Sequence, residues 1–211
     1  MPSLTLLENQ GFSNTNYLLE TSKKNYIIKK FGSLHVDRKQ EFNIACQAYK
    51  KGIGAKHIYF DDSFMICEFL EGSHKTKLNH IDIKKIALLL KKLHSIKTDK
   101  RGLVLCHRDL NPRNFIFFND IKLIDWEYAS LGDFYFDLSS VIIEFDLNKK
   151  DEKLFLHSYF KNKYKTDKNK IYTFKIKYLE LCIKWFKKQN NLKEQLKFKK
   201  KLCKYKRRVK R

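Results

Sequence analysis

Apolar and polar positions come in short alternating blocks between residues 103 and 124, and this pattern predicts short strands joined by tight turns. The apolar blocks cover residues 103–106, 115–118 and 121–124. Between the last two blocks, Asn119-Asp120 is typical of a hairpin turn. Pairing of the two strands through that turn would bring Asn114, which enters the first strand, beside Asp125, which leaves the second.

The first third of the chain predicts a small sheet. Residues 17–20 and 25–31 lie on either side of a polar turn at 21–24, which favours a hairpin. Residues 64–70 form a further strand, and a polar loop at residues 11–16 precedes the hairpin.

Residues at helical spacing predict two helices before the central hairpin. The first begins after Asp37, which can cap it with Gln40 three residues later, and ends at Gly52. The second begins at Asp82 as its cap. The predicted buried stripes are Phe42, Ala45, Cys46 and Tyr49 in the first helix and Ile83, Ile86, Ala87, Leu90, Leu93 and His94 in the second.

The last third of the chain is helical by pattern. A helix from Asp137 runs through Glu144, and the spacing of apolar residues over 172–186 predicts one long amphipathic helix. A further helix, residues 192–211, holds eleven Lys and Arg residues against the single acid Glu194. Such a helix can contact a membrane or nucleic acid, but a solvated lysine-rich face is the simpler interpretation.

Polar side chains with a shared chemistry flank the predicted hairpin. The carboxylate of Asp125 beside the carboxamide of Asn114 is a set of hard oxygen ligands, which suits Mg²⁺. Asp109 precedes Asn114 by five residues, where its carboxylate can accept a proton from an attacking hydroxyl. A metal site beside a base is the minimal equipment for phosphoryl transfer.

The formal net charge of +22 raises nucleic acid or an anionic membrane surface as a partner. Lysine supplies 38 of the 45 basic residues and arginine only seven, whereas bidentate recognition of bases and phosphates favours arginine. The composition therefore disfavours nucleic acid, although the charge does attract anionic substrates such as ATP.

Cysteine use and hydropathy indicate where the protein works. Five scattered cysteines without a C-x-x-C pair are typical of reduced thiols in a cytosolic protein. No apolar run approaches the ~20 residues of a membrane span, and the N-terminus lacks the features of a secretory signal. We expect a cytoplasmic protein without a transmembrane segment, and the sequence leaves its oligomeric state open.

Two segments resemble kinase-like phosphotransferases of small molecules, and most of all the choline and ethanolamine kinases: His107-Arg108-Asp109-Leu110-Asn111-Pro112-Arg113-Asn114 and Ile124-Asp125-Trp126-Glu127-Tyr128-Ala129. The resemblance spans roughly residues 11–185 and is specific in residues 105–144. It implies that Asp109 is the catalytic base, that Asn114 and Asp125 hold magnesium, and that ATP donates its γ-phosphate.

The same resemblance implies nucleotide-binding residues in the first third of the chain. The polar loop with Ser13 and Asn14 would cover the phosphates, and Lys29 would reach them as a point charge. Glu41 either pairs with Lys29 or is a solvated first-turn glutamate. The adenine would meet backbone groups of the segment between the lobes, at Glu68 and Leu70.

Three further residues are expected to be structural. By resemblance, His107 holds the geometry of the loop, and Asp137 braces that loop from behind by hydrogen bonds to its backbone. His94 is interpreted as a packed or hydrogen-bonded histidine. The remaining five histidines show no metal-ligand spacing, so no zinc site is predicted.

Glu144 occupies the place where choline kinases carry an acid in the substrate pocket, and Phe145 follows it, as an aromatic residue does there. A lone carboxylate among apolar neighbours needs a partner, and a cationic substrate is a candidate. In choline kinases two tryptophans three residues apart enclose the trimethylammonium group. Here that pair would be Cys182 and Trp185, so one ring is missing. We also count Glu127 among the substrate residues.

Together these features predict an α+β protein with a two-lobed protein-kinase-like fold. Residues 1–69 would form the nucleotide-binding lobe and residues 70–211 a mostly helical lobe with the catalytic hairpin and the basic C-terminal helix. The predicted reaction is ATP- and Mg²⁺-dependent phosphorylation of a small amino alcohol, choline or ethanolamine. The alternatives are a thiamine or aminoglycoside kinase of the same fold, an inactive relative, and a non-catalytic basic binding protein.

Overall fold

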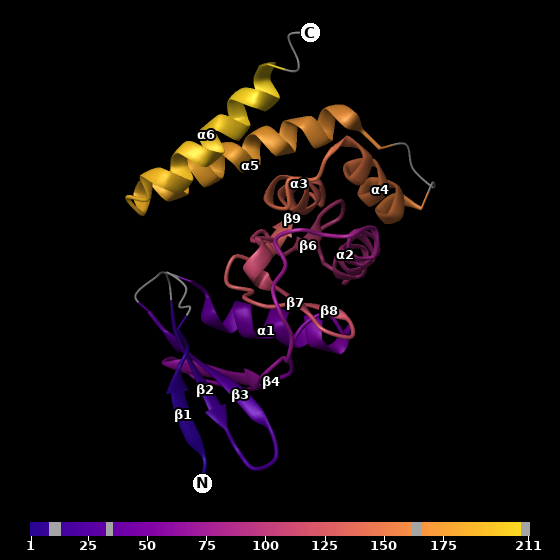
Figure 1. Ribbon diagram of the computed structural model, residues 1–211. Coiled ribbons are helices and arrows are strands. Elements are labelled where there is room, and N and C mark those ends of the chain that lie inside the picture. Colours follow the sequence, from indigo (N-terminus) through magenta and orange to yellow (C-terminus); the bar gives the residue numbers. More distant parts are fainter. Residues whose placement is uncertain (9–13, 33–35, 162–165, 208–211) are drawn as a thin grey trace.

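The computed structural model describes residues 1–8, 14–32, 36–161 and 166–207 (Figure 1). A five-stranded sheet is built from the first third of the chain, and most helices come from the rest. The predicted α+β, two-lobed architecture is confirmed. Ser13, expected to cover the phosphates, lies outside the described residues.

The sheet is antiparallel throughout, with the strand order β1-β2-β3-β5-β4. The predicted hairpin is present as β2 and β3. The edge strands β1 and β4 were not predicted. All four residues of β1 are exposed, and two adjacent residues of β4 are exposed, so neither strand shows the alternation of buried and exposed positions that identifies a strand. The strands are β1 (Ser3–Leu6), β2 (Asn14–Glu20), β3 (Asn25–Phe31), β4 (His57–Phe60) and β5 (Phe64–Glu68).

Helix α1 (Arg38–Lys50) lies between this sheet and the rest of the molecule (Figure 1). Asp37 caps it as predicted, accepting a hydrogen bond from the Gln40 N–H (2.8 Å). The predicted buried stripe is wrong at Tyr49, which is 43% exposed. Phe42 stacks on Phe60 of the sheet, while the side packed into the main core is Ile44, Ala45 and Ala48. The helix uses two faces because it lies between two layers.

The central segment forms two small two-stranded antiparallel sheets. Strand β6 (Val104–Cys106) pairs with β9 (Ser130–Gly132), and β7 (Phe115–Phe117) pairs with β8 (Ile121–Leu123) after a 3₁₀ turn, η1 (Pro112–Asn114). The loop between β7 and β8 has three residues, one more than predicted, and the Phe118 N–H donates to the Asp120 carbonyl within it (3.2 Å).

Five further helices complete the fold: α2 (His80–Leu93), α3 (Tyr135–Glu144), α4 (Lys149–Phe160), α5 (Lys168–Lys188) and α6 (Leu192–Arg207). The cap of α2 is Asn79, and Asp82 is its partner three residues on in a capping box, so the predicted cap was wrong. Asp137 lies in the first turn of α3 and does not start it. Within the described ranges, no helix combines the length and apolar character that crossing a membrane requires.

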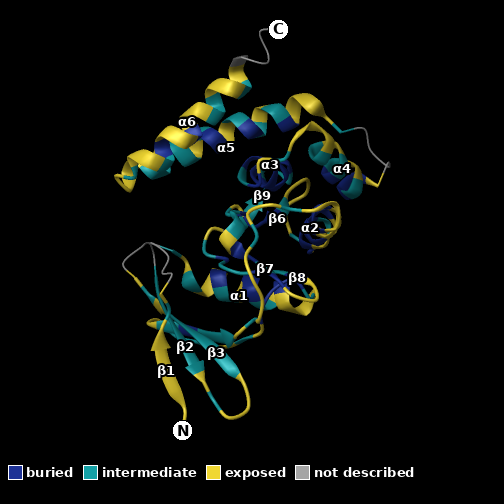
Figure 2. Cartoon of the chain, in the orientation of Figure 1, coloured by how far each residue is buried: buried dark blue, intermediate teal, exposed yellow. Residues whose placement is uncertain are grey.

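One apolar core joins the two lobes. It includes α1 residues together with side chains from α2, the β7–β8 hairpin, α3 and α4, and the Leu123 N–H of β8 donates to the Ile53 carbonyl just after α1 (2.8 Å). A second, smaller cluster of Ile143, Tyr178, Leu179 and Phe198 joins α3, α5 and α6. Figure 2 shows buried positions concentrated in the middle of the molecule and an α6 that is mostly exposed.

Candidate active site

Lys29 of β3 is the centre of a charge network between the sheet and the hairpin. Its Nζ lies 2.7 Å from Glu41 Oε1 and 2.6 Å from Asp125 Oδ1. Burial lowers the pKa of Lys29, but the charges of Asp125, Glu41 and Glu127 outweigh it, so the pKa is raised above its ordinary value. Of the two interpretations of Glu41, the ion pair with Lys29 is the one that the structure has. The neighbouring Lys30 is exposed.

Arg38, which sequence reasoning missed, links the same network to the sheet. It donates to Glu41 Oε2 (2.8 Å), to Glu127 Oε2 (3.3 Å) and to Asn14 Oδ1 (2.8 Å). The Asn14 amide in turn donates to Glu127 Oε2 (2.9 Å). Glu127, expected among the substrate residues, thus lies in the network around Lys29. A signal was available, since Arg38 is one of only seven arginines in a lysine-rich chain.

Asp125 follows β8 in the left-handed region of backbone space, with φ of +66°. Burial raises the pKa of its carboxyl, but the charge and hydrogen bond of Lys29 outweigh this and lower the pKa. The predicted neighbourhood of Asn114 and Asp125 is also present, because the Ile124 N–H donates to the Asn114 carbonyl (3.1 Å).

Asp109 is held on the loop by two amides. Its Oδ1 accepts a hydrogen bond from Asn111 Nδ2 (3.0 Å) and its Oδ2 from Asn114 Nδ2 (2.9 Å). Burial raises the pKa of Asp109 above its ordinary value, with the negative charge of Asp125 adding to the rise, although the two amides and His107 oppose it. A half-buried carboxylate with a raised pKa is better suited to accept a proton than an ordinary aspartate.

Asp137 fixes the backbone of that loop. Its two carboxylate oxygens accept hydrogen bonds from the N–H groups of His107 (2.8 Å) and Arg108 (3.0 Å). The Arg108 backbone has a φ of +67°, a conformation that needs such external support. The His107 ring lies 3.0 Å from the Ile124 carbonyl, so the loop is also tied to the end of β8.

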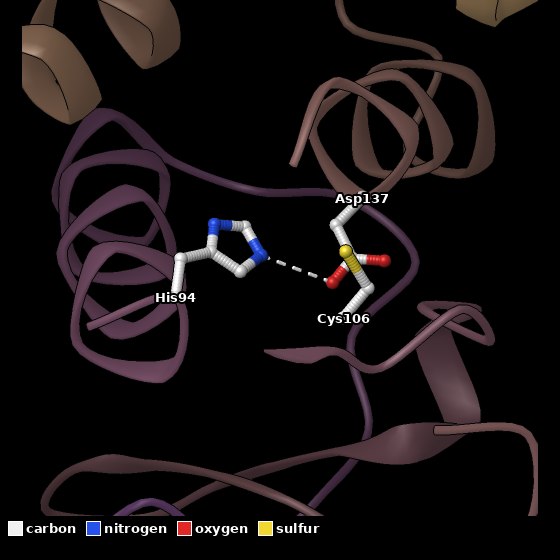
Figure 3. A group of neighbouring side chains, drawn as sticks. All are labelled: His94, Cys106 and Asp137. Atoms are coloured by element: carbon white, nitrogen blue, oxygen red, sulfur yellow. Dashed lines mark hydrogen bonds and ion pairs between the residues drawn. The ribbon is translucent and has the colours of Figure 1, made fainter. Parts of the chain in front are cut away.

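His94, Cys106 and Asp137 come together behind the loop from α2, β6 and α3 (Figure 3). Their ligand atoms lie within 4.8 Å of one another. His94 Nε2 is 3.1 Å from Asp137 Oδ2, however, and His94 Nδ1 is 2.8 Å from the Tyr159 hydroxyl. Burial raises the pKa of the Cys106 thiol, which disfavours the thiolate that zinc binds. The group is a hydrogen-bonded brace, in keeping with the structural interpretation of His94.

The residues at the hairpin end fit a magnesium ion. The amide nitrogen of Asn114 is engaged by Asp109, which orients the remaining oxygen of the carboxamide. Asp125 keeps a second carboxylate oxygen besides the one that meets Lys29. Carboxylate and carboxamide oxygens are the ligands that Mg²⁺ prefers, with its other positions filled by water and phosphate.

Glu144 at the end of α3 receives a hydrogen bond from the Tyr178 hydroxyl of α5 (2.6 Å). Burial raises the pKa of Glu144, the Tyr178 hydrogen bond and the charge of Lys201 lower it, and the charge of Asp109 raises it further. The next residue, Phe145, packs edge-to-face on Phe115 (5.4 Å), which directly follows Asn114, so the end of α3 lies near the start of the β7–β8 hairpin. Tyr178 was missed by sequence reasoning, although a tyrosine on the apolar side of a helix needs a polar partner.

The other residues expected at the substrate end are placed differently. Phe145 is 6% exposed and packs edge-to-face on Phe115 in the main core, so its position supports a packing role. Cys182 is near Glu144, and burial, with the charge of Glu144, raises the pKa of its thiol to about 12. Trp185 is half-buried, with its ring edge-to-face on Phe186 (4.9 Å).

At the segment between the lobes, the Glu68 side chain pairs with Lys24 (2.9 Å). The Glu68 N–H donates to the Lys56 carbonyl (2.8 Å) and the Phe69 N–H to the Asn25 carbonyl (2.9 Å). Any adenine contact there would therefore fall to the Glu68 carbonyl and to Leu70.

Comparison with known proteins agrees with this geometry. Residues 86–163 match the phosphotransferase enzyme family. A LicA homologue of Metamycoplasma hominis is 50% identical over 54 residues, which are 25% of this chain and 22% of that protein. LicA of Haemophilus influenzae is 35% identical over 86 residues, 38% of this chain and 32% of that protein. The chain thus spans less than a third of the length of the curated relatives it matches.

Solved structures match almost the whole chain. Choline kinase LicA from Streptococcus pneumoniae superposes with a TM-score of 0.78 at 21% identity, over 95% of this chain and 92% of that one. A Plasmodium vivax ethanolamine kinase gives 0.80 at 18% identity, over 97% and 81%. LicA in complex with AMP gives 0.73 at 24% identity, over 96% and 93%.

The chain has the fold of these kinase structures, and its residues 86–163 are similar to the phosphotransferase enzyme family. The sequence relatives are LicA proteins, and the structural neighbours include a choline kinase and an ethanolamine kinase.

Proposed function

We propose that the chain transfers the γ-phosphoryl group of ATP to the hydroxyl of a small cationic amino alcohol, with choline as the first candidate and ethanolamine as the second. The observation that carries this proposal is the position of a half-buried acid, Glu144, at the end of α3, where the next residue Phe145 packs on Phe115 of the hairpin, while Asp125 at the other end of the hairpin pairs with Lys29. A nucleotide site and a cation site thus converge on one base.

Each residue has a role that its contacts support. Asp109, with a raised pKa, accepts the proton of the substrate hydroxyl. Lys29, kept charged by Glu41, contacts the phosphates of the nucleotide. Asn114 and Asp125 hold magnesium, which when bound neutralises charge on the phosphates. Asn14 and Arg38 shape the phosphate side, and the Glu68 carbonyl and Leu70 meet the adenine.

Glu144 is the residue that selects a cation. A half-buried carboxylate is costly without a partner, and Tyr178 supplies one hydrogen bond without neutralising the charge. A quaternary or primary ammonium group beside it would complete the compensation. Trp185 remains the proposed aromatic wall on α5, with one ring where choline kinases have two, and a well-placed ring contributes ~0.5–2 kcal/mol of cation–π attraction.

The test is an ADP-release assay with choline, ethanolamine, thiamine and kanamycin as acceptors. We expect turnover of choline or ethanolamine, and a loss of ~10²–10⁴-fold in kcat for Asp109→Asn. Asp120→Asn at the exposed tip of the hairpin is the matched control and should retain full activity. Wild-type protein that turns over none of the four compounds would contradict the proposal.

The assay panel also separates the alternatives of the same fold. Thiamine is a flat cation with a primary alcohol, so one acid and one aromatic ring do not distinguish it from choline. An aminoglycoside carries several ammonium groups and needs several carboxylates, whereas residues 166–211 hold only three acids. A Trp185→Ala variant with an unchanged KM for choline would remove Trp185 from the site.

We place the reaction in the cytoplasm, where ATP is available and thiols stay reduced. All five cysteines are free, which suits that compartment.

A further inference from the structure

The basic charge of the chain is concentrated at one end. Residues 166–211 contain 18 of the 45 Lys and Arg residues but only three of the 23 Asp and Glu residues, so they carry a net charge of +15 out of +22. A lysine-rich composition without selection for binding would spread the excess along the chain. The excess instead follows α5 and α6, which lie side by side at the end of the molecule away from the sheet (Figure 1).

Helix α6 has a buried inner face and an exposed outer face. Its inner face holds Phe198, which is 3% exposed and packs with Leu202 and Tyr205 in the small cluster shared with α5. Its two aromatic rings are on this side. The inner face attaches the helix to the protein, and the outer face is exposed (Figure 2).

The outer face combines apolar side chains with lysines. Leu192 is 65% exposed and Leu196 is 46% exposed, and the spacing of four residues places them one above the other on the helix. Cys203, seven residues after Leu196, continues this stripe and is also exposed. The lysines exposed on α6 are Lys193, Lys197, Lys199, Lys200, Lys204 and Lys206, and those exposed on α5 are Lys168, Lys170, Lys177, Lys184, Lys187 and Lys188.

Few of these charges are neutralised within the protein. Lys197 pairs with Glu194 (2.9 Å) and Lys206 with Glu180 (3.2 Å). Lys170 pairs with Asp133, which lies outside the two helices (2.6 Å). Glu194 and Glu180 are the acids within α5 and α6, so the twelve exposed lysines of these helices far outnumber them. A surface with this excess repels a second copy of itself and attracts an extended anion.

We infer that the outer face of α6, with the exposed lysines of α5 and α6 around it, docks on an anionic lipid surface. Leu192 and Leu196 enter the boundary between headgroups and acyl chains, and the lysines meet the anionic headgroups. Nucleic acid fits less well. It calls for arginines or stacking aromatics, and the rings of α6 face inward while its outer face offers leucines and lysines.

The experiment is co-sedimentation of the full chain with vesicles of phosphatidylcholine alone or with about one third phosphatidylglycerol. We expect binding to the anionic vesicles, weakened when salt rises from about 0.1 M to about 0.5 M, because salt screens exposed charges. A polarity-sensitive fluorophore can be attached to Cys203, because the other four cysteines are partly or fully buried. Its emission should shift to the blue on binding, because the outer face then leaves water.

Two sets of variants test the apolar and the electrostatic parts of the proposed binding. Leu192→Ala with Leu196→Ala should weaken binding about tenfold or more, whereas Leu88→Ala, at a leucine 45% exposed on α2, should not. Lys193→Glu with Lys200→Glu should weaken it about fivefold or more per lysine, and Lys23→Glu with Lys56→Glu, at exposed sheet-side positions, should have much less effect.

Three results would overturn the inference: no binding to anionic vesicles, equal losses in the sheet-side lysine pair, or binding to an RNA oligonucleotide in preference to vesicles with no dependence on Leu192 and Leu196. None of these measurements uses the kinase reaction, so the inference and the proposed function can fail separately.

Discussion

The hairpin with the candidate catalytic residues and the α5–α6 pair are built in opposite ways. The loop and hairpin around Asp109 are fixed by β3, α1, α2 and α3, elements far apart in the sequence. Helix α6 is attached through one apolar face and a few ties, such as Lys201 to the Ile143 carbonyl (2.8 Å). The comparison teaches that the candidate catalytic residues lie where many segments converge, while the outer surface with the excess of lysines belongs to a more simply attached element.

The largest effect should come from Asp137→Ala. The change leaves the buried N–H groups of His107 and Arg108 and the His94 ring without their acceptor, which should lower the free energy of unfolding by about 4 kcal/mol or more. Urea unfolding measures it, with the exposed Asp62→Ala as the matched control. A loss below that of an ordinary surface substitution would show that the loop does not depend on this brace.

Phe198→Ala should destabilise the α5–α6 pair. The ring is buried in the small cluster, and its removal should cost about 3 kcal/mol. Hydrogen exchange should accelerate in α6 and the adjoining part of α5 and stay slow in β7 and β8, because the two clusters are separate. Equal acceleration in the hairpin would show that the two regions unfold as one unit.

The pH dependence of the reaction probes the base. Asp109 must be ionised to accept a proton, and its pKa is raised above the ordinary 3.8, so kcat/KM should fall as the pH drops through this higher value. Asn111→Ala removes a hydrogen bond that lowers the pKa, so it should move the acid limb to still higher pH. An acid limb that stays in place would assign the titration to another group.

The smallest effect is expected from Tyr178→Phe. Loss of the hydroxyl removes the hydrogen bond to Glu144, and one such bond to a charged group contributes about 1.5 kcal/mol, so KM for the amino alcohol should change by about tenfold or less. The pKa of Glu144 should rise, because this bond lowers it. Steady-state kinetics checks the first point, and Tyr172→Phe on the same helix is the control.

Local patterns determined the central part of the site. The apolar blocks and the hairpin between them put Asn114 beside Asp125, because both residues lie within a few positions of paired strands. The cap at Asp37 and the long helix α5 follow from short-range spacing in the same way. The order of Asp109 and Asn114 along the loop before the hairpin is likewise local, whereas the conformation of that loop depends on Asp137 of α3.

Tertiary packing decided the rest. Asn14 and Glu127 are 113 positions apart, and Lys29 and Asp125 are 96 apart, so no local pattern could reveal these contacts. The same holds for the Tyr178 partner of Glu144 and for Phe145, whose ring is taken up by the core. The sequence by itself determined which groups could carry out phosphoryl transfer, because residue type and short spacing fix the chemistry. Which of them contact one another was decided by the packing of helices and strands from distant parts of the chain, where burial and charge balance select each partner.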